Sequence, residues 1–361
     1  LSFPFASLLS VCIQFPASQH RLRQMILLCI LVIAAIEANP HVNIDKKLSG
    51  EQLNDYINNA QSTWKAVLPK FSRRGSLMDV KYAKRIPNAI EAEPRNIADP
   101  PDEFDSRTAW PGCPSIGEIR EQSNCASSWA IAAAQAMSDR ICIDSTERVQ
   151  ISLAADDLLS CCGFYCGSGC EGGYSYQAWH WWKMNGLCTG SGFYDNDGCK
   201  PYPLEPCGTH TDKNGVVHTY VCGNTVAQTP VCAKSCINSA YNVSYTDDKY
   251  YGQSVYYLSS TAQAIKDEIF VNGPVETTLL VYEDFEHYNS GIYQHLSGEE
   301  LGSQSVKIIG WGSDDGTPYW IVANSWSTEW GEDGFFRILL GTNECEIEGA
   351  VVGGLALSNY H

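Results

Sequence analysis

The chain has 361 residues, which is long enough for one two-domain protein with large hydrophobic cores. Its 44% hydrophobic and 18% charged residues are typical of a globular protein and exclude a disordered one. The formal net charge of −17 excludes nucleic acid and anionic membrane surfaces as expected partners, because like charges repel.

The N-terminus carries the pattern of a secretory signal. Arg21 and Arg23 precede the apolar run 26–36, and small residues continue to Ala38. This run is shorter than the roughly 20 residues that a bilayer span requires. Because the chain opens on Leu1, we interpret residues 1–24 as upstream sequence and residues 25–38 as the signal peptide. We therefore expect a secreted protein with no membrane span.

Residues 39–101 contain no cysteine and differ in composition from the remainder. The stretch 48–57 predicts a helix, because Ser49 stands three residues before Gln52, as in a capping box, and apolar residues follow on one face. A disordered leader is the alternative interpretation of this region.

From residue 102 onward the patterns predict a helical half followed by a strand-rich half. We expect helices at 127–137 and 174–185, a loop-rich stretch at 188–236 and a short helix after Ser260. Strands are expected at 275–282, 306–309, 319–322 and 335–339. This order is typical of an α+β fold with a cleft between the halves.

The sixteen cysteines indicate disulfide bonds, because a signal-bearing chain folds in an oxidising compartment. Cys12 and Cys29 fall in the N-terminal 38 residues, which leaves fourteen. A zinc site is the alternative explanation for the closely spaced Cys161, Cys162, Cys166 and Cys170, but their spacing is not that of paired C-x-x-C units. We expect no metal and no cofactor.

Residues 125–129, Cys-Ala-Ser-Ser-Trp, resemble the active-site motif Cys-Gly-Ser-Cys-Trp of the papain family of cysteine proteases, in which the second Cys is the nucleophile. Further stretches resemble the cathepsin B-type members of that family: 119–122, 138–143, 161–163, 170–174, 272–276, 290–295, 310–312 and 324–326. The resemblance runs from about residue 48 to the end of the chain. It implies a papain-like fold, with a helical domain, a barrel-like strand domain and the active-site cleft between them.

The same resemblance implies how the chain is divided. Residues 39–101 would be a cathepsin B-type propeptide and residues 102–361 the peptidase domain. A loop insertion at about 199–236 would be the occluding loop, which in the family covers one end of the cleft.

The resemblance assigns four catalytic positions. Ser128 occupies the position of the nucleophilic Cys, Gln304 that of the basic His, Asn324 that of the residue orienting the His, and Gln122 that of the oxyanion donor. A carboxamide cannot take the proton of a serine hydroxyl near neutral pH, and losing such a group costs on the order of 10⁶ in rate. We therefore favour a hydroxyl that caps the helix N-terminus as the role of Ser128, over that of a nucleophile.

The resemblance also implies substrate-binding positions. Gly172 and Gly173 would pair with substrate backbone, and Trp326 would shield Asn324. His210 would be the one remaining cation of a carboxylate-docking pair, since Thr209 replaces the other. Ala350 at the base of the S2 pocket predicts a neutral pocket. Ser303, which replaces a family glycine, is expected to crowd substrate backbone.

The bridges that the resemblance implies are Cys113–Cys142, Cys125–Cys170, Cys161–Cys232, Cys162–Cys166, Cys199–Cys236 and Cys207–Cys222. Cys188 and Cys345 are left over, and their pairing stays open. Asn242 begins an Asn-Val-Ser acceptor for N-glycosylation.

These patterns favour a catalytically inactive, secreted or lysosomal homologue of cathepsin B that keeps its peptide cleft. Its expected partners are peptides or protein substrates, cystatin-like inhibitors and its own propeptide, which another protease would have to cut. Two alternatives remain. The first is a slow peptidase that uses Ser128 as nucleophile; the second is a structural or antigenic secreted protein whose cleft has no function.

Overall fold

Most strands of the second half of the chain belong to one sheet, and Gln304, one of the predicted catalytic positions, lies on this sheet. The computed structural model describes residues 48–60, 62–70, 72–93, 100–212, 214–222 and 225–358, all within the unit Lys46–His361. The predicted upstream sequence (1–24) and signal peptide (25–38) lie outside the described residues.

The main sheet has the strand order β1-β7-β10-β9-β8-β6-β11-β5, with β2 paired to β8. Its strands are β1 (Trp64–Ala66), β2 (Phe104–Asp105), β5 (Tyr256–Tyr257), β6 (Val275–Tyr282), β7 (Tyr288–Tyr293), β8 (Glu300–Asp314), β9 (Thr317–Ala323), β10 (Phe335–Leu339) and β11 (Val352–Gly353). Neighbours are antiparallel except β10 and β7, which are parallel. The four strands expected from the sequence are confirmed.

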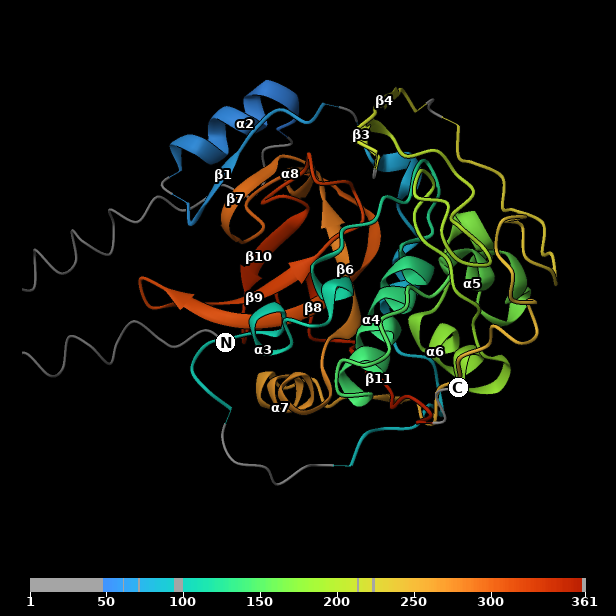
Figure 1. Ribbon diagram of the computed structural model, residues 1–361. Helices are drawn as coiled ribbons and strands as arrows, with labels where there is room; N and C mark the ends of the chain where they lie inside the picture. The colour runs from blue at the N-terminus through green and yellow to red at the C-terminus, as the bar shows by residue number, and fades with distance from the viewer. Residues whose placement is uncertain are drawn as a thin grey trace, which may run out of the picture. The chain divides into compact units, whose positions relative to one another are not determined.

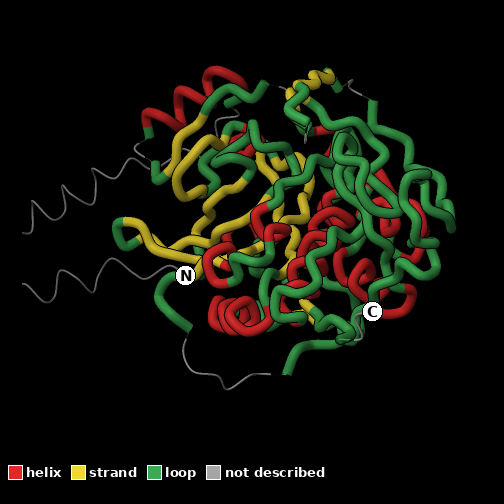
Figure 2. Tube along the Cα trace, viewed as in Figure 1, coloured by secondary structure: helices red, strands yellow, loops and turns green. Residues whose placement is uncertain are grey.

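The helices are α2 (Gly50–Asn59), α3 (Ser106–Ala109), α4 (Ser128–Asp144), α5 (Ala155–Cys161), α6 (Ser175–Asn185), α7 (Ala262–Asn272) and α8 (Glu283–Glu286). Short 3₁₀ turns lie at Arg74–Ser76, Val80–Ala83, Pro114–Gly117, Gly163–Tyr165, Gly169–Glu171 and Glu344–Glu346. Most helical residues between 128 and 185 gather on one side of the sheet (Figures 1 and 2). This arrangement is the predicted α+β fold.

Helix α4 extends seven residues beyond the predicted end at Met137. It is buried along almost its whole length, so even its polar residues need partners inside the protein. Asp139 Oδ2 forms an ion pair with Lys307 Nζ of β8 at 2.7 Å, and Arg140 Nη1 forms one with Glu268 Oε1 of α7 at 2.8 Å. These ion pairs with distant segments allow a polar stretch to continue a buried helix.

The N-terminal segment, residues 48–93, contributes to both hydrophobic cores. Leu53 and Ile57 of α2 and Trp64 of β1 belong to the core of the sheet, whereas Met78 and Tyr82 belong to the core around α4. Figure 1 shows α2 and β1 over one end of the sheet, beside β7. The segment is therefore ordered where it is described, and the disordered-leader alternative is wrong for these residues.

Two local predictions need correction or extension. Ser49 stands at the N-cap of α2 with extended backbone angles, but its side chain makes no capping hydrogen bond, so the predicted capping box is wrong. The predicted loop-rich stretch contains a separate hairpin of β3 (Gly208–Thr211) and β4 (Val217–Tyr220). Within the described part of the chain, no helix has the length and apolar character that crossing a membrane requires.

Candidate functional site

Ser128 is the first residue of α4, and its side chain is fully buried. Its hydroxyl oxygen accepts a hydrogen bond from the backbone N–H of Ser305 in β8 over 3.1 Å. The N-cap of α4 is Ser127, whose side chain makes no capping bond either. The favoured prediction that Ser128 caps the helix is therefore wrong: its hydroxyl joins the helix to the sheet instead.

Gln304 lies on β8 next to this contact and is also fully buried. Its Nε2 donates to Gln122 Oε1 (2.7 Å), to Asn324 Oδ1 (2.9 Å) and to Ser325 Oγ (3.1 Å). Its own carbonyl oxygen Oε1 has no hydrogen-bond partner. The structure thus brings Gln304, Asn324 and Gln122 together, and none of the hydrogen bonds of Gln304 goes to Ser128.

Gln122 links this network to the N-terminal segment. Its Nε2 donates to the backbone carbonyls of Ser76 (2.7 Å) and Cys125 (2.9 Å). Ser325 Oγ donates to its Oε1 over 2.7 Å. The side chain predicted to stabilise an oxyanion therefore already holds a peptide carbonyl, and that carbonyl belongs to the same chain.

The N-terminal segment contacts β8 at Met78, which forms an isolated antiparallel bridge with Ser303. Met78 and Ser303 exchange two backbone hydrogen bonds of 2.9 and 2.8 Å. The hydroxyl of Ser303 donates to the carbonyl of Asp79 over 2.9 Å. The expectation that Ser303 would crowd a peptide backbone is wrong, because its side chain adds a hydrogen bond to the peptide instead.

The two glycines expected to bind substrate have different neighbours. Gly172 has a φ of +121°, and a Cβ built there would lie 2.5 Å from the ring of Tyr82, so only glycine allows this close approach. Gly173 pairs with Gly167 and packs against Trp129. Gly172 therefore lies directly against Tyr82 and Met78 of the N-terminal segment.

Other predicted binding residues also lie near the segment. Ala350 is buried in the same core as Met78 and Tyr82, so an apolar surface lies at this position. Trp326 is fully buried and packs against Phe285 and Trp330.

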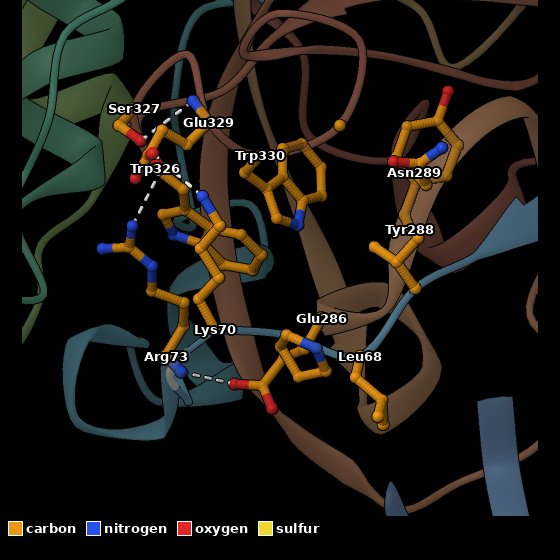
Figure 3. Close-up of a pocket in the computed structure, with 13 residues that line it drawn as sticks. Leu68, Lys70, Arg73, Glu286, Tyr288, Asn289, Trp326, Ser327, Glu329 and Trp330 are labelled. Atoms are coloured by element: carbon orange, nitrogen blue, oxygen red, sulfur yellow. Dashed lines mark hydrogen bonds and ion pairs between the residues drawn. The ribbon is translucent and has the colours of Figure 1, made fainter. Parts of the chain in front are cut away.

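Basic residues of the N-terminal segment pair with carboxylates of the domain that follows. Arg73 bonds to Glu121 over 2.5 Å, Lys70 to Glu329 over 2.9 Å and Arg74 to Glu283 over 3.4 Å. The bond from Lys70 lowers the pKa of Glu329, whereas burial raises the pKa of nearby Glu286. Figure 3 shows Arg73, Lys70 and Glu329 together at one end of a cavity of about 90 Å³.

His210 lies on the β3–β4 hairpin directly opposite His218. Both imidazole rings stack on the ring of Tyr194, at 5.3 and 3.9 Å between centroids. The hairpin is tied to the protein where the backbone N–H of Thr209 donates to Glu329 over 3.2 Å. The carboxylate of Glu329 therefore contacts both the hairpin that carries His210 and the side chain of Lys70.

Among the described residues, no histidine side chain forms a hydrogen bond with the Ser128 hydroxyl. His295 stacks on Tyr282 and lies 3.1 Å from Asp284, and His287 is buried beside α8, where desolvation lowers its pKa. The hydrogen bonds of Ser128 involve no imidazole. The site accordingly contains a hydroxyl and a carbonyl-binding donor but no described group that accepts the hydroxyl proton.

All six disulfides implied by the resemblance are present. Cys188 and Cys345 are free thiols, which answers the question left open by the sequence. Cys188, Cys199 and Asp248 come within ligand distance of one another, but Cys199 is already bonded to Cys236. Because burial also raises the pKa of Cys188, this cluster does not supply the thiolates that a metal ion needs.

Sequence reasoning missed the partners that complete the site. The hydroxyl of Ser325 bonds to Gln122 and Gln304, and the carboxylate of Glu121 binds Arg73. Both residues are direct sequence neighbours of predicted site residues, since Ser325 follows Asn324 and Glu121 precedes Gln122. The basic run containing Arg73 and Arg74 was a visible signal for acidic contacts. The acceptors could not be identified from sequence, because they lie about 50 to more than 200 residues away.

Comparisons with known proteins give a consistent result. The family model described as papain family cysteine protease matches residues 100–355. The chain is 46% identical over 336 residues to cathepsin B-like cysteine proteinase 5 of Caenorhabditis elegans, covering 90% of this chain and 96% of the relative. A gut-specific cysteine proteinase of the same organism is 45% identical over 335 residues, with 91% and 97% coverage. Procathepsin B S9 from Trypanosoma congolense superposes with a TM-score of 0.72 at 33% identity, covering 86% and 99% of the two chains.

Proposed function

Because this chain belongs to the papain family of cysteine proteases and has cathepsin B-like relatives, we propose that it is a cathepsin B-like protein that binds peptides without cleaving them. The observation that carries the proposal is the bonding of Gln304. Its amide donates to Gln122, Asn324 and Ser325, and it has no basic atom with which to take a proton from Ser128. Without that transfer, a serine hydroxyl stays a poor nucleophile.

The cleft supports binding because its peptide-holding groups are retained. Gln122 holds the carbonyl of Ser76, and Ser303 pairs with Met78 through the backbone. Both bond types involve backbone groups of the bound segment, so another extended peptide can make them. Ligands of this class are peptides, the chain's own N-terminal segment acting as a propeptide, and cystatin-like inhibitors that occupy the cleft without needing a nucleophile.

Maturation and location belong to the same proposal. A chain without protease activity cannot remove residues 39–101 by itself, so a separate protease would cut it. A signal peptide at residues 25–38, six disulfides and an exposed Asn242 in an N-glycosylation acceptor support a secreted or lysosomal protein.

The test is peptide hydrolysis by the protein after another protease has cut it, at about pH 5 to 7. It is measured beside the double variant Ser128→Cys/Gln304→His, whose turnover shows that the scaffold is intact. We expect turnover only in the double variant, with binding of the same peptide to both proteins. Hydrolysis by the natural sequence that stops in Ser128→Ala and resists thiol alkylation would establish a serine-dependent peptidase instead. Absence of peptide and inhibitor binding would leave a structural role.

A further inference from the structure

One arginine of the N-terminal segment fills a site formed by the domain that follows it. The side chain of Arg73 is only 6% exposed and that of Glu121 only 4%, and their Nη1 and Oε1 atoms lie 2.5 Å apart. Arg73 Nη2 donates to the carbonyl of Trp326 over 2.8 Å. The guanidinium carbon also lies 5.9 Å from the centroid of the Trp326 ring. Three different contacts therefore recognise one guanidinium group.

The domain's half of this site is held in place by other contacts. The second carboxylate oxygen of Glu121 accepts the backbone N–H groups of Ser123 (2.6 Å) and Cys207 (3.1 Å). Cys207 is itself fixed by its disulfide to Cys222. These bonds orient the carboxylate so that Oε1 faces the guanidinium. The site is thus preorganised by residues that do not belong to the bound segment.

The surroundings favour a cationic ligand over a neutral one. Glu286 accepts the backbone N–H of Arg73 over 2.5 Å, and Glu283 and Glu329 pair with the neighbouring cations Arg74 and Lys70. Figure 3 shows Arg73 reaching toward Trp326, with Lys70 and Glu329 beside it. A peptide rich in basic residues therefore complements this face in charge.

Removal of the segment would take away the cation bound by Oε1 of Glu121, while the other carboxylate oxygen keeps its bonds from Ser123 and Cys207. A ligand that brings a new cation to this oriented carboxylate restores the charge-assisted hydrogen bond. The geometry points to an arginine-binding subsite in the opened cleft, where the guanidinium of a peptide ligand lies between Glu121 and Trp326. This inference rests on the proposed peptide-binding function and names the class of peptide bound.

Arginine fits this site better than lysine for a geometric reason. The carboxylate of Glu121 and the carbonyl of Trp326 are contacted by two different nitrogens of one planar group, and the ring of Trp326 lies near its face. A lysine ammonium is a compact point charge that cannot reproduce this fork and plane. Citrulline keeps the planar shape of the arginine side chain but lacks its charge. Comparing the two therefore separates the contribution of the charge from that of the shape.

The test uses the complete chain with a protease site engineered into residues 94–99 and the substitution Arg73→Met, which loosens the chain's own segment once it is cut. A labelled synthetic peptide with the sequence of residues 70–85 is titrated in by fluorescence anisotropy, with arginine, lysine or citrulline at position 73. We expect the citrulline peptide to bind on the order of 100-fold more weakly than the arginine peptide, and the lysine peptide to lie between them.

The same titration is repeated with Glu121→Gln, which keeps an oxygen for Ser123 and Cys207 but removes the charge. The ratio between arginine and citrulline peptides should then fall close to one. Glu329→Gln is the matched control and should leave the ratio unchanged, because Glu329 pairs with Lys70 rather than Arg73. Equal binding of the arginine and citrulline peptides, or a ratio that persists in Glu121→Gln, would overturn the subsite alone. If none of the peptides binds, the proposed peptide-binding function fails, and the subsite fails with it.

Discussion

The Nε2 atom of Gln304 lies 2.7 Å from Oε1 of Gln122, so one buried carboxamide donates to another. Through this contact, the residue proposed for the base position orients the residue proposed for the oxyanion position. Gln122 then presents its own Nε2 to the carbonyl of Ser76. An uncharged network therefore joins the sheet, the loop before α4 and the bound N-terminal segment. This network is suited to holding a peptide carbonyl but lacks a group that moves protons.

Replacement of Gln304 by Met should destabilise the protein without changing its hydrolytic activity. Methionine has a similar size but cannot donate to the side-chain oxygens of Gln122 and Asn324, which would keep only the bonds that Ser325 donates to them. The partial loss of buried hydrogen bonds is expected to lower the free energy of unfolding by about 1 to 2 kcal/mol. Urea denaturation measures it. The exposed Gln150→Met is the control and should change stability little.

Glu276 should make the protein less stable as the pH rises. Burial raises its pKa to about 8; Oε2 accepts a bond from Trp179 over 2.7 Å, whereas Oε1 has no partner. Between the ordinary glutamate pKa of 4.5 and about 8, the folded state holds a proton that the unfolded chain has released. The stability contribution of this group therefore falls with rising pH, by roughly 1.4 kcal/mol per pH unit.

The variant Glu276→Gln removes this titration and isolates it from that of other groups. Its stability relative to the natural protein should increase from about pH 5 to pH 8, measured by denaturant unfolding at each pH. A difference in stability that stays constant over this range would contradict the assignment of the shift to Glu276.

The two ion pairs that hold the N-terminal segment should differ greatly in importance. Arg73 and Glu121 are both buried, so Arg73→Met leaves an unpaired buried carboxylate, and proteolytic release of the segment should speed up by on the order of 100-fold. Lys70 is 66% exposed, so Lys70→Met should change this rate little. Limited proteolysis followed by mass spectrometry measures both. Equal effects of the two substitutions would show that burial does not decide the strength of these contacts.

Cys188 should resist alkylation in the folded protein. It is fully buried, and burial raises the pKa of its thiol, so little reactive thiolate forms near neutral pH. Mass spectrometry after iodoacetamide treatment should find Cys188 unmodified in the native protein and modified after unfolding without reductant. Cys345, which is also a free thiol, should be alkylated after unfolding as well. Recovery of a peptide linked through Cys188 and Cys345 would refute both expectations.

The sequence predicted the secondary structure best where the local pattern and the packing agree. Helix α6 ends at Asn185, directly before Gly186, whose φ of +66° is favourable for glycine, and β6 has the predicted bounds. The end of α4 was missed because Asp139 and Arg140 look like surface residues in the sequence. Their partners, Lys307 and Glu268, are more than 120 residues away and cannot be recognised from local pattern.

The sequence by itself determined the residue types at the catalytic positions and the family resemblance, and the six cysteine pairs followed only from that resemblance. A carboxamide at Gln304 excludes a basic imidazole there whatever the fold does. Only the tertiary structure decided where that carboxamide donates, that Ser128 bonds to Ser305 instead of capping a helix, and that Glu121 holds Arg73. The physical reason is that residue chemistry is fixed locally. Hydrogen bonds and ion pairs, in contrast, depend on which distant segments the folded chain brings within about 3 Å of each other.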